Sequence, residues 1–348
     1  MAVLVTGAAG FIGSNLVRQL LERWSDQQIV SFDLLSYAGH LENLADVIDH
    51  PRHTFVRGDV ADRDQVAALF AGHDVTGVIH LAAESHVDRS IVDPMAFVRT
   101  NVLGTVTLLQ EATRVWNGRR DVRFHHVSTD EVFGALGEEG KFDEATGYSP
   151  NSPYSASKAS SDHFVRAWHE TYDLPTVLTN CTNNYGPYQF PEKLIPTVIT
   201  RALAGEKIPI YGRGDNVRDW LYVEDHCDAL ALVYEHGADG ETYCIGGEAE
   251  ATNLELVGML LDHVDSARGL EPGTSAGLIE FVTDRPGHDF RYAMDITRIR
   301  TELGWAPSVS LQEGLARTVG WYLRHGEWMA TVQGEQHREF TESWYENR

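Results

Sequence analysis

The segment Ala2-Val-Leu-Val-Thr6-Gly7-Ala-Ala-Gly10-Phe-Ile-Gly13 decides the fold of this 348-residue chain. Ala2 to Val5 is a short apolar run typical of a buried strand, and the residues after Gly13 have the spacing of an amphipathic helix that reaches about Arg23. Glycines at intervals of three between a strand and a helix let backbone N–H groups approach a pyrophosphate at the helix N-terminus. The alternative is a glycine-rich turn that binds nothing.

The next strand supports the dinucleotide interpretation. Gln28 to Phe32 is a second apolar run, and it ends at Asp33, 20 residues beyond Gly13. A carboxylate at this place accepts hydrogen bonds from the adenosine ribose hydroxyls and repels a 2′-phosphate. The pattern therefore predicts that the cofactor is NAD rather than NADP.

Strands and helices continue to alternate along the chain. Further strands are predicted at His53 to Arg57, Gly77 to Leu81, Val122 to Val127 and Pro175 to Cys181, and helices at Asp62 to Ala71, Asp93 to about Trp116 and Tyr154 to Tyr172. This alternation predicts an α/β fold, a doubly wound parallel (Rossmann) sheet with ligands at the carboxyl ends of its strands.

The pattern changes to shorter elements after about residue 180. Helical runs at Val223 to Glu235, Leu254 to Val264 and Leu311 to Leu323 are expected in a smaller C-terminal lobe that binds substrate. We divide the chain into an NAD-binding domain at 1–182, a mostly substrate-binding lobe at 183–325 from which some segments return to the sheet, and a tail at 326–348 to which the sequence assigns no role.

Composition restricts the partners and the compartment. The formal net charge is -23, so the surface repels phosphate backbones and nucleic acid is not expected as a partner. Cys181, Cys227 and Cys244 show no paired spacing, which argues against disulfides and against a metal site and fits a reducing compartment. No signal peptide or membrane span is expected, so we predict a cytoplasmic protein.

Two short segments carry candidate chemistry. Ser128-Thr129-Asp130-Glu131 follows a strand, and Tyr154 and Lys158 lie one helical turn apart on one face. A nearby lysine is expected to lower the pKa of the Tyr154 phenol from about 10, which makes it a base. The two adjacent carboxyl groups can supply an acid and a second base. The alternative for Asp130 and Glu131 is a turn or helix cap.

Polar groups elsewhere complete the predicted cleft. Ser85 ends a strand and is expected to face the ligand, whereas His86 is interpreted as a polar loop residue. Asp59 either reaches the adenine amino group or belongs to a helix N-cap region. As a set, the donors Lys193, Arg213, Arg218, Arg285, His288 and Arg291 indicate a clamp for a nucleotide diphosphate, although any single arginine is explained as well by a surface ion pair.

The two longest predicted helices have apolar stripes that are candidates for a subunit interface. Asp93 to Trp116 and Tyr154 to Tyr172 from each of two subunits would form a bundle, which predicts a homodimer. Burial of both stripes within one subunit is the alternative.

These residues resemble a known family over residues 2 to about 325. Thr6-Gly-Ala-Ala-Gly-Phe-Ile-Gly-Ser14, Ala82-Ala-Glu-Ser-His-Val-Asp-Arg-Ser-Ile91 and Tyr154-Ser-Ala-Ser-Lys158 are similar to the extended short-chain dehydrogenases. More narrowly, the chain resembles the dTDP-glucose 4,6-dehydratases, and the motifs that carry this are Ser128-Thr-Asp-Glu-Val-Phe-Gly134, Asn183-Asn-Tyr-Gly-Pro187, Phe190-Pro-Glu-Lys-Leu-Ile-Pro196, Val217-Arg-Asp-Trp-Leu-Tyr-Val-Glu-Asp225 and Asp284-Arg-Pro-Gly-His-Asp289.

The resemblance implies a set of site residues. Those expected to hold NAD are Gly7, Gly10, Phe11, Ile12, Gly13, Asp33, Leu34, Ser36, Asp59, Val60, Leu81, Ala82, Ala83, Ser85, Thr100, Tyr154, Lys158 and Asn184. Those expected to hold the sugar nucleotide are Ser85, His86, Thr129, Asn183, Glu192, Lys193, Leu194, Pro209, Tyr211, Arg218, Asn253, Asp284, Arg285 and His288. Two positions depart from the family pattern: Leu34 replaces a lysine, and Phe290 stands where a second arginine is common.

The implied activity is NAD-dependent loss of water from dTDP-glucose, with Thr129, Asp130, Glu131, Tyr154 and Lys158 as the catalytic residues. Tyr154 takes the O4 proton, Glu131 the C5 proton, and Asp130 protonates the departing C6 hydroxyl, which leaves a 4-keto-6-deoxy sugar. A nucleotide-sugar 4-epimerase or decarboxylase, and a non-catalytic NAD-binding regulator, are the alternatives. The choice between thymidine and uridine nucleotides stays open.

Overall fold

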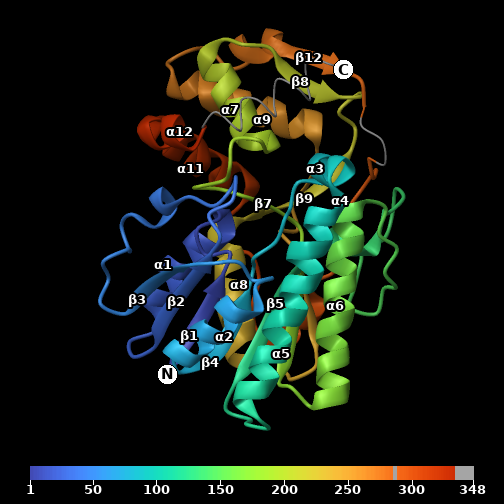
Figure 1. Cartoon of the computed structure of the whole chain (residues 1–348). Coiled ribbons are helices and arrows are strands. Elements are labelled where there is room, and N and C mark those ends of the chain that lie inside the picture. The colour runs from blue at the N-terminus through green and yellow to red at the C-terminus, as the bar shows by residue number, and fades with distance from the viewer. Residues whose placement is uncertain (285–287, 334–348) are drawn as a thin grey trace.

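The structure is a computed structural model, and it describes residues 1–284 and 288–333. A seven-stranded sheet of order β10-β6-β5-β4-β1-β2-β3 lies at its centre (Figure 1). All of its neighbouring strands pair in parallel. The strands are β1 (Ala2–Thr6), β2 (Gln28–Asp33), β3 (His53–Arg57), β4 (Val75–His80), β5 (Arg123–Thr129), β6 (Thr176–Cys181) and β10 (Thr242–Ile245). The prediction of a doubly wound α/β sheet is confirmed.

Helices cover both faces of this sheet. One face carries α1 (Phe11–Arg23) and α8 (Val223–His236), which contact each other, and the other carries α2 (Arg63–Gly72), α5 (Gly104–Trp116) and α6 (Pro153–Tyr172). Each interface is filled by its own cluster of buried aliphatic and aromatic side chains. Strand order reverses between β1 and β4, and at such a reversal the carboxyl ends of parallel strands open a crevice.

Local capping sets where α6 begins. The Ser152 side chain accepts the backbone N–H of Ser155, while the Ser155 hydroxyl accepts that of Ser152, and Pro153 occupies the first helical turn. This start fixes the rotation of α6 and turns both Tyr154 and Lys158 into the protein interior.

The helix predicted from Asp93 to Trp116 is not regular. It consists of α4 (Pro94–Phe97), a π-helical stretch η2 (Val98–Leu103) and α5 in immediate succession. In the π-helical part the Gly104 N–H donates to the Arg99 carbonyl, five residues back. Gly104 also has no room for a side chain, because a Cβ there would lie 2.6 Å from Val60 Cγ2. Wide turns of this kind often occur at functional sites, and Thr100 lies in this one.

Two strand boundaries also differ from the prediction. β5 continues to Thr129, past the apolar run, because its ladder with β6 extends to the pair Thr129 and Cys181. β4 begins at Val75 and ends at His80 rather than spanning Gly77 to Leu81.

The helix predicted at Val223 to Glu235 was expected in the lobe, and this part of the prediction is wrong. It is α8, and it packs on α1 because its buried residues, among them Val223, Leu230 and Val233, complete the apolar layer beneath the sheet. β10 then follows as the edge strand beside β6.

The remaining elements form a smaller lobe at the carboxyl edge of the sheet (Figure 1). It is built on the sheets β11-β9-β7 and β12-β8 and has its own apolar cluster. Its strands are β7 (Asn183–Tyr185), β8 (Ile208–Tyr211), β9 (Val217–Tyr222), β11 (Glu250–Thr252) and β12 (Ile279–Val282). Its longer helices are α7 (Leu194–Ala204), α9 (Asn253–Ala267) and α11 (Leu311–Arg324). The short elements, from the whole chain rather than from this lobe alone, are α3 (Val87–Val92), α10 (Thr297–Leu303), α12 (Gly326–Val332), η1 (Leu41–Leu44), η3 (Asp130–Phe133) and η4 (Thr274–Leu278).

The domain boundaries at 182 and 325 stay a prediction. None of the helices in the described ranges combines the length and the apolar character that a membrane crossing requires.

Candidate active site

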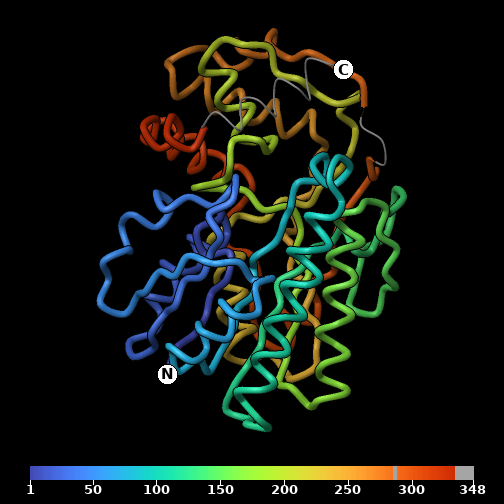
Figure 2. Tube along the Cα trace, in the orientation of Figure 1, coloured from blue at the N-terminus to red at the C-terminus, as the bar shows by residue number. Residues whose placement is uncertain are grey.

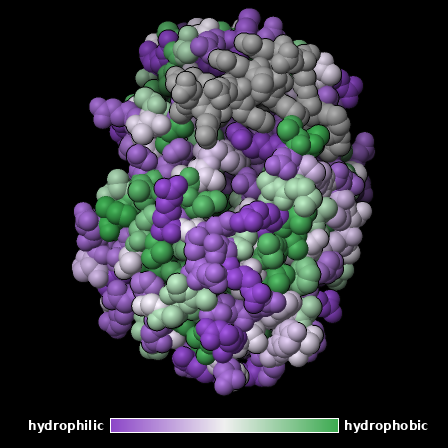
Figure 3. Space-filling model, in the orientation of Figure 1, coloured by the Kyte–Doolittle hydropathy of each residue, from purple (hydrophilic) through white to green (hydrophobic). Residues whose placement is uncertain are grey.

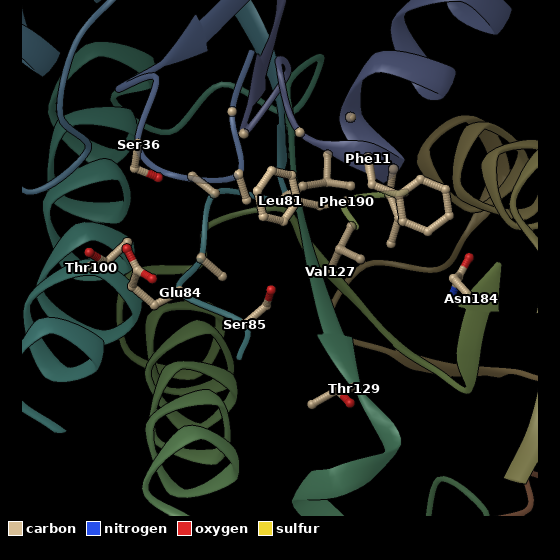
Figure 4. Close-up of a pocket in the computed structure, with 18 of the residues that line it drawn as sticks. Phe11, Ser36, Leu81, Glu84, Ser85, Thr100, Val127, Thr129, Asn184 and Phe190 are labelled. Carbon is tan, nitrogen blue, oxygen red and sulfur yellow. The ribbon is translucent and has the colours of Figure 1, made fainter. Parts of the chain in front are cut away.

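A cavity of about 330 Å³ opens at the carboxyl ends of the central strands. Figure 4 shows Ser36, Glu84 and Thr100 on one side of it and Asn184 on the other, with Val127 and Thr129 on the strand between. All 18 residues expected to hold NAD line it, as do all five expected catalytic residues. The structure therefore brings these two predicted sets together in one place.

The glycine turn between β1 and α1 leaves no space for side chains. Gly7 has φ +68°, and a Cβ there would lie 2.7 Å from the Ala82 backbone nitrogen. A Cβ at Gly13 would lie 2.1 Å from the Gly7 carbonyl oxygen. Within the described residues no side chain caps the first turn of α1, and residues 10–13 of this turn line the cavity, so a phosphate can bind at this helix N-terminus. The turn thus fits the diphosphate of a dinucleotide.

Asp33 is held by backbone donors at the end of β2. Its Oδ2 accepts the Ala9 N–H at 2.9 Å and its Oδ1 accepts the Leu35 N–H at 2.8 Å. Burial raises the pKa of this carboxyl group above its ordinary value. Each carboxylate oxygen can accept a further hydrogen bond, so the group fits a ribose diol.

Asp59 lies at the far end of the same cavity. The N-cap of α2 is Asp62, and Asp59 lies three residues before it, where its N–H donates to the Gln65 side chain at 2.9 Å. Asp59 thus belongs to the N-cap region, in agreement with the alternative. Its Oδ1 accepts the Ala61 N–H at 2.8 Å, and its Oδ2 accepts Arg99 at 2.7 Å. Its contact with adenine stays a prediction.

The two adjacent carboxyl groups have unequal surroundings. Asp130 is 2% exposed, whereas Glu131 is half-buried. Desolvation raises the pKa of Asp130 well above its ordinary value, and the neighbouring charge of Glu131 raises it further. The Thr129 hydroxyl donates to Asp130 Oδ1 at 3.1 Å. Asp130 therefore stays protonated to higher pH than an ordinary aspartate, as expected for an acid.

The prediction that Lys158 lowers the pKa of Tyr154 is wrong for the protein alone. Burial raises the pKa of the Tyr154 phenol well above 10, and the charge of Glu131 is the next cause. The ammonium of Lys158 points elsewhere, because it donates to the Val127 carbonyl at 2.9 Å and lies 3.4 Å from His126 Nε2. The phenol packs edge-on against Phe97.

The predicted substrate residues divide into two groups. Ser85, Thr129, Asn183, Glu192 and Lys193 line the cavity, and Lys193 Nζ donates to the Ser85 carbonyl at 3.1 Å. The residues that do not line it are His86, Leu194, Pro209, Tyr211, Arg218, Asn253, Asp284 and His288. Arg285 lies outside the described residues.

Most of the predicted anion clamp is engaged within the protein. Arg213 pairs with Asp215, and Arg291 with Glu250 at 2.6 Å, so for these two the ion-pair alternative holds. Arg218 donates to the backbone carbonyls of residues 217, 289 and 290. His86 caps α3 by accepting the Arg89 N–H, and His288 contacts Asp284 at 2.6 Å. Among the clamp residues that the structure describes, Lys193 lines the cavity, and the clamp as a whole stays a prediction.

Comparison with known proteins extends this geometry. Residues 4–318 match the family described as GDP-mannose 4,6 dehydratase. A dTDP-glucose 4,6-dehydratase of Shigella flexneri is 49% identical over 362 aligned positions that cover 100% of both chains. The solved dTDP-glucose 4,6-dehydratase of Streptomyces venezuelae, with NAD and TYD bound, is 46% identical with a TM-score of 0.88 over 95% of this chain and 100% of that one.

The chain belongs to the dTDP-glucose 4,6-dehydratase family. The resemblance stated from the motifs is confirmed. A UDP-glucose 4-epimerase of Thermotoga maritima, solved with UDP-glucose, also has this fold, at 30% identity and a TM-score of 0.82 over 93% of this chain and 99% of that one. The dehydratases and this epimerase thus share one scaffold.

Sequence reasoning missed one buried carboxyl group behind the dehydratase site. Asp162 lies one helical turn after Lys158 and accepts from the Ser128 hydroxyl at 2.8 Å and the Tyr148 hydroxyl at 3.0 Å. It also lies 3.2 Å from His126 Nε2. Its charge opposes the effect of burial, which lowers the pKa of Lys158. The spacing of four residues from Lys158 was the signal that could have found it.

Other cavity residues were also missed. Glu84, Gln189 and Phe190 line it, and Glu192 contacts Arg89, whose guanidinium lies 3.8 Å from the centre of the Tyr37 ring. Glu84, Gln189 and Phe190 lie in irregular segments, where no periodicity indicates which side chains face a cavity.

Replacing Gly13 by alanine tests the glycine turn. The added Cβ must push the Gly7 carbonyl aside, so we expect Gly13→Ala to lower the free energy of unfolding by about 1–3 kcal/mol and to weaken NAD binding at least tenfold. The matched control is Gly258→Ala in α9, where a Cβ meets nothing within 4 Å. The control should gain about 0.5–1 kcal/mol and bind NAD normally, as measured by urea unfolding and calorimetric titration. Equal behaviour of the two variants would contradict the close approach.

Asp130→Asn tests the raised pKa. The pKa of the Asp130 carboxyl group is higher in the folded protein than in the unfolded chain, where it is about 3.9. Such a group contributes its full stabilisation below the unfolded pKa. That stabilisation is lost as the pH rises through the folded pKa. The asparagine variant has no such loss. The wild type should therefore lose stability relative to Asp130→Asn as the pH rises. In urea unfolding, the free energy of unfolding of the variant minus that of the wild type should increase between about pH 5 and 8. A difference independent of pH would show that Asp130 titrates normally.

Proposed function

We propose that this protein uses NAD to convert dTDP-glucose into dTDP-4-keto-6-deoxyglucose with loss of water. The observation that carries the proposal is the arrangement at the end of β5. There the buried Asp130, whose pKa is raised well above its ordinary value, adjoins Glu131, and both line the same cavity as Tyr154 and the glycine turn. The family membership supports the same conclusion.

Each side chain has a definable part in this reaction. When bound, NAD would accept hydride from C4 of the sugar and return it to C6. Tyr154 takes the proton from the O4 hydroxyl, which the Thr129 hydroxyl orients. Formation of a ketone at C4 acidifies the C5–H, and the half-buried Glu131 removes that proton. Asp130 donates its proton to the departing C6 hydroxyl, so that water leaves and a C5=C6 double bond remains beside the C4 ketone. When hydride is returned to C6, the proton held by Glu131 goes back to C5, which gives the 4-keto-6-deoxy sugar.

The surroundings of Tyr154 indicate what is needed to ionise it. Its pKa in the protein alone is raised by burial and by the nearby carboxylate of Glu131. A positive charge in the cavity favours the phenolate, and the oxidised nicotinamide ring carries one. Lys158 lies one turn away on the same helix and adds to this effect when its ammonium turns from the Val127 carbonyl.

The nearest rival reaction is 4-epimerisation, which the Thermotoga maritima neighbour's name states for that protein. Epimerisation and decarboxylation also oxidise C4, but neither needs an acid and a base for elimination at C5 and C6. The buried Asp130 with its raised pKa, placed directly beside Glu131, therefore favours dehydration. A non-catalytic regulator would need none of these buried groups.

Glu131→Gln separates the oxidation step from the elimination. The variant should still reduce bound NAD when dTDP-glucose is added, because Tyr154 is intact, but loss of water should slow by roughly 10²–10⁴-fold without the C5 base. NADH absorbance and the mass of the sugar nucleotide are the two measurements. The control is Glu138→Gln, at an exposed position. Dehydration by Glu131→Gln at the wild-type rate would exclude Glu131 as this base.

The wild-type reaction itself tests the substrate. We expect dTDP-glucose to lose the mass of one water and UDP-glucose to react more slowly, since the Streptomyces venezuelae relative is a dTDP-glucose enzyme solved with TYD bound. A product of unchanged mass would support an epimerase, and loss of carbon dioxide from a sugar acid would support a decarboxylase.

The apolar surface on the helices supports the dimer in this proposal. Val92 and Met95 are 63% and 68% exposed, and Val98, Leu103 and Phe164 are also exposed on η2 and α6. Figure 3 shows apolar side chains gathered over these helices, on the right of the molecule. Two copies of this surface would bury each other as a bundle of helices. The three buried thiols are consistent with the reducing cytoplasm as the compartment.

Met95→Glu tests the dimer. A carboxylate in the centre of an apolar interface has no opposite charge or hydrogen bond to compensate the cost of its burial. The variant should therefore sediment as a monomer while the wild type sediments as a dimer. Phe281→Glu on β12 is the control, because Phe281 is 56% exposed but lies in the lobe, and its mass in solution should match that of the wild type. A dimeric Met95→Glu variant would place the interface elsewhere.

A further inference from the structure

The last two described helices carry an aromatic cluster that touches the first part of the chain. The cluster consists of Trp321 and Tyr322 on α11, Trp328 on α12, and Tyr188 from the loop after β7. Ring centroids are 4.7 Å apart for Tyr188 and Trp321 and 5.0 Å apart for Trp321 and Trp328. Figure 2 shows the red C-terminal helices next to the blue N-terminal part of the tube.

One chain of hydrogen bonds runs from this cluster to the glycine turn. Trp328 Nε1 donates to Asn43 Oδ1 at 2.7 Å, and Asn43 Nδ2 donates to the Ala9 carbonyl at 2.7 Å. The Ala9 N–H in turn donates to Asp33 at 2.9 Å. Asn43 is 1% exposed, so water does not replace these partners.

The indole group determines the orientation of the Asn43 amide. An indole N–H only donates, so the amide oxygen must face Trp328. The amide nitrogen then faces the Ala9 carbonyl and holds the turn between Gly7 and Gly10. Trp328 therefore acts on the turn through Asn43, although it lies outside the cavity.

A second chain of hydrogen bonds runs to the opposite wall. The buried Tyr322 hydroxyl donates to the Gln189 carbonyl at 2.5 Å, and Gln189 Nε2 donates to the Asn184 carbonyl at 2.9 Å. Both Gln189 and Asn184 line the cavity. The C-terminal helices thus support two walls, one on each side of the predicted cofactor.

We propose that α11 and α12 form a clasp that slows the release of NAD, with Trp328, Asn43 and Tyr322 as positioning residues. This inference rests on the proposed function, in which the cofactor is reduced and reoxidised within one turnover and must not leave in between. A chain that held NAD only by the glycine turn would release the reduced cofactor more often and lose the ketone intermediate with it.

A purely structural role for the aromatic cluster is the competing explanation. Trp321 provides a matched comparison, because it belongs to the same cluster and, within residues 1–284 and 288–333, its indole nitrogen donates no hydrogen bond. Trp321→Phe and Trp328→Phe remove the same atoms from neighbouring rings. Only Trp328→Phe breaks the connection to Asn43.

The experiment measures NAD+ binding by calorimetry and NAD+ release by dialysis of the full-length protein. We expect Trp328→Phe and Tyr322→Phe each to raise the NAD+ dissociation constant roughly three- to tenfold, the range expected from loss of one hydrogen bond, and Trp321→Phe to leave it unchanged. Asn43→Ala combined with Trp328→Phe should be no weaker than Asn43→Ala alone, because both break one chain.

Activity with and without added cofactor separates positioning from folding. After dialysis, Trp328→Phe should lose activity that excess NAD+ restores, with wild-type kcat and KM for dTDP-glucose once NAD+ is saturating. A loss that NAD+ does not restore, or an equal change in Trp321→Phe, would overturn the clasp and leave a structural role. Unchanged NAD+ binding in both Trp328→Phe and Tyr322→Phe would overturn it as well. Absence of NAD+ binding by the wild type would instead remove the proposed function together with the clasp.

Discussion

Desolvation of ionisable groups is the constraint on which the site depends. Asp130, Tyr154, Lys158 and Asp162 are all buried around the end of β5. Burial of a charge is costly unless hydrogen bonds or an opposite charge compensate it, and here the compensation is uneven. Asp162 accepts hydrogen bonds from two hydroxyl groups and lies near Lys158, whereas Asp130 accepts one from Thr129 and adjoins the charge of Glu131. The protein thus stabilises the charged form of one carboxyl group more than that of the other.

The parts of the fold that could be predicted are those encoded in short, local patterns. The apolar run, the glycines and Asp33 lie within one strand–turn–helix–strand unit, and each has a direct steric or electrostatic reason. The same holds for Tyr154 and Lys158, because helical spacing places them on one face. The catalytic and cofactor residues came from such patterns or from a family that shares them, and they meet in one cavity.

What could not be predicted depends on contacts between distant segments. The π-helical stretch lies where Gly104 packs against Val60. α8 covers the same face of the sheet as α1 because α1 presents an apolar surface to it. The direction of the Lys158 ammonium is decided by the Val127 carbonyl, which the sequence places in a strand without showing its orientation. The ion pairs made by two of the predicted clamp residues could not be foreseen for a related reason. Arg213 and Arg291 have acidic partners in the lobe, and composition does not reveal which charges pair.

Unequal burial also assigns opposite roles to two adjacent carboxyl groups. If Asp130 and Glu131 were equally exposed, both would ionise near neutral pH, and neither could protonate a leaving hydroxyl. Because Asp130 lies beneath the strand end and Glu131 on its rim, the mutual repulsion of their charges is relieved by protonation of Asp130. The less buried Glu131 is therefore suited to removing a proton, and the deeply buried Asp130 to donating one to the hydroxyl that is expelled. The scaffold is shared with an epimerase. In this chain the deep burial of one side chain, that of Asp130, suits the scaffold to elimination.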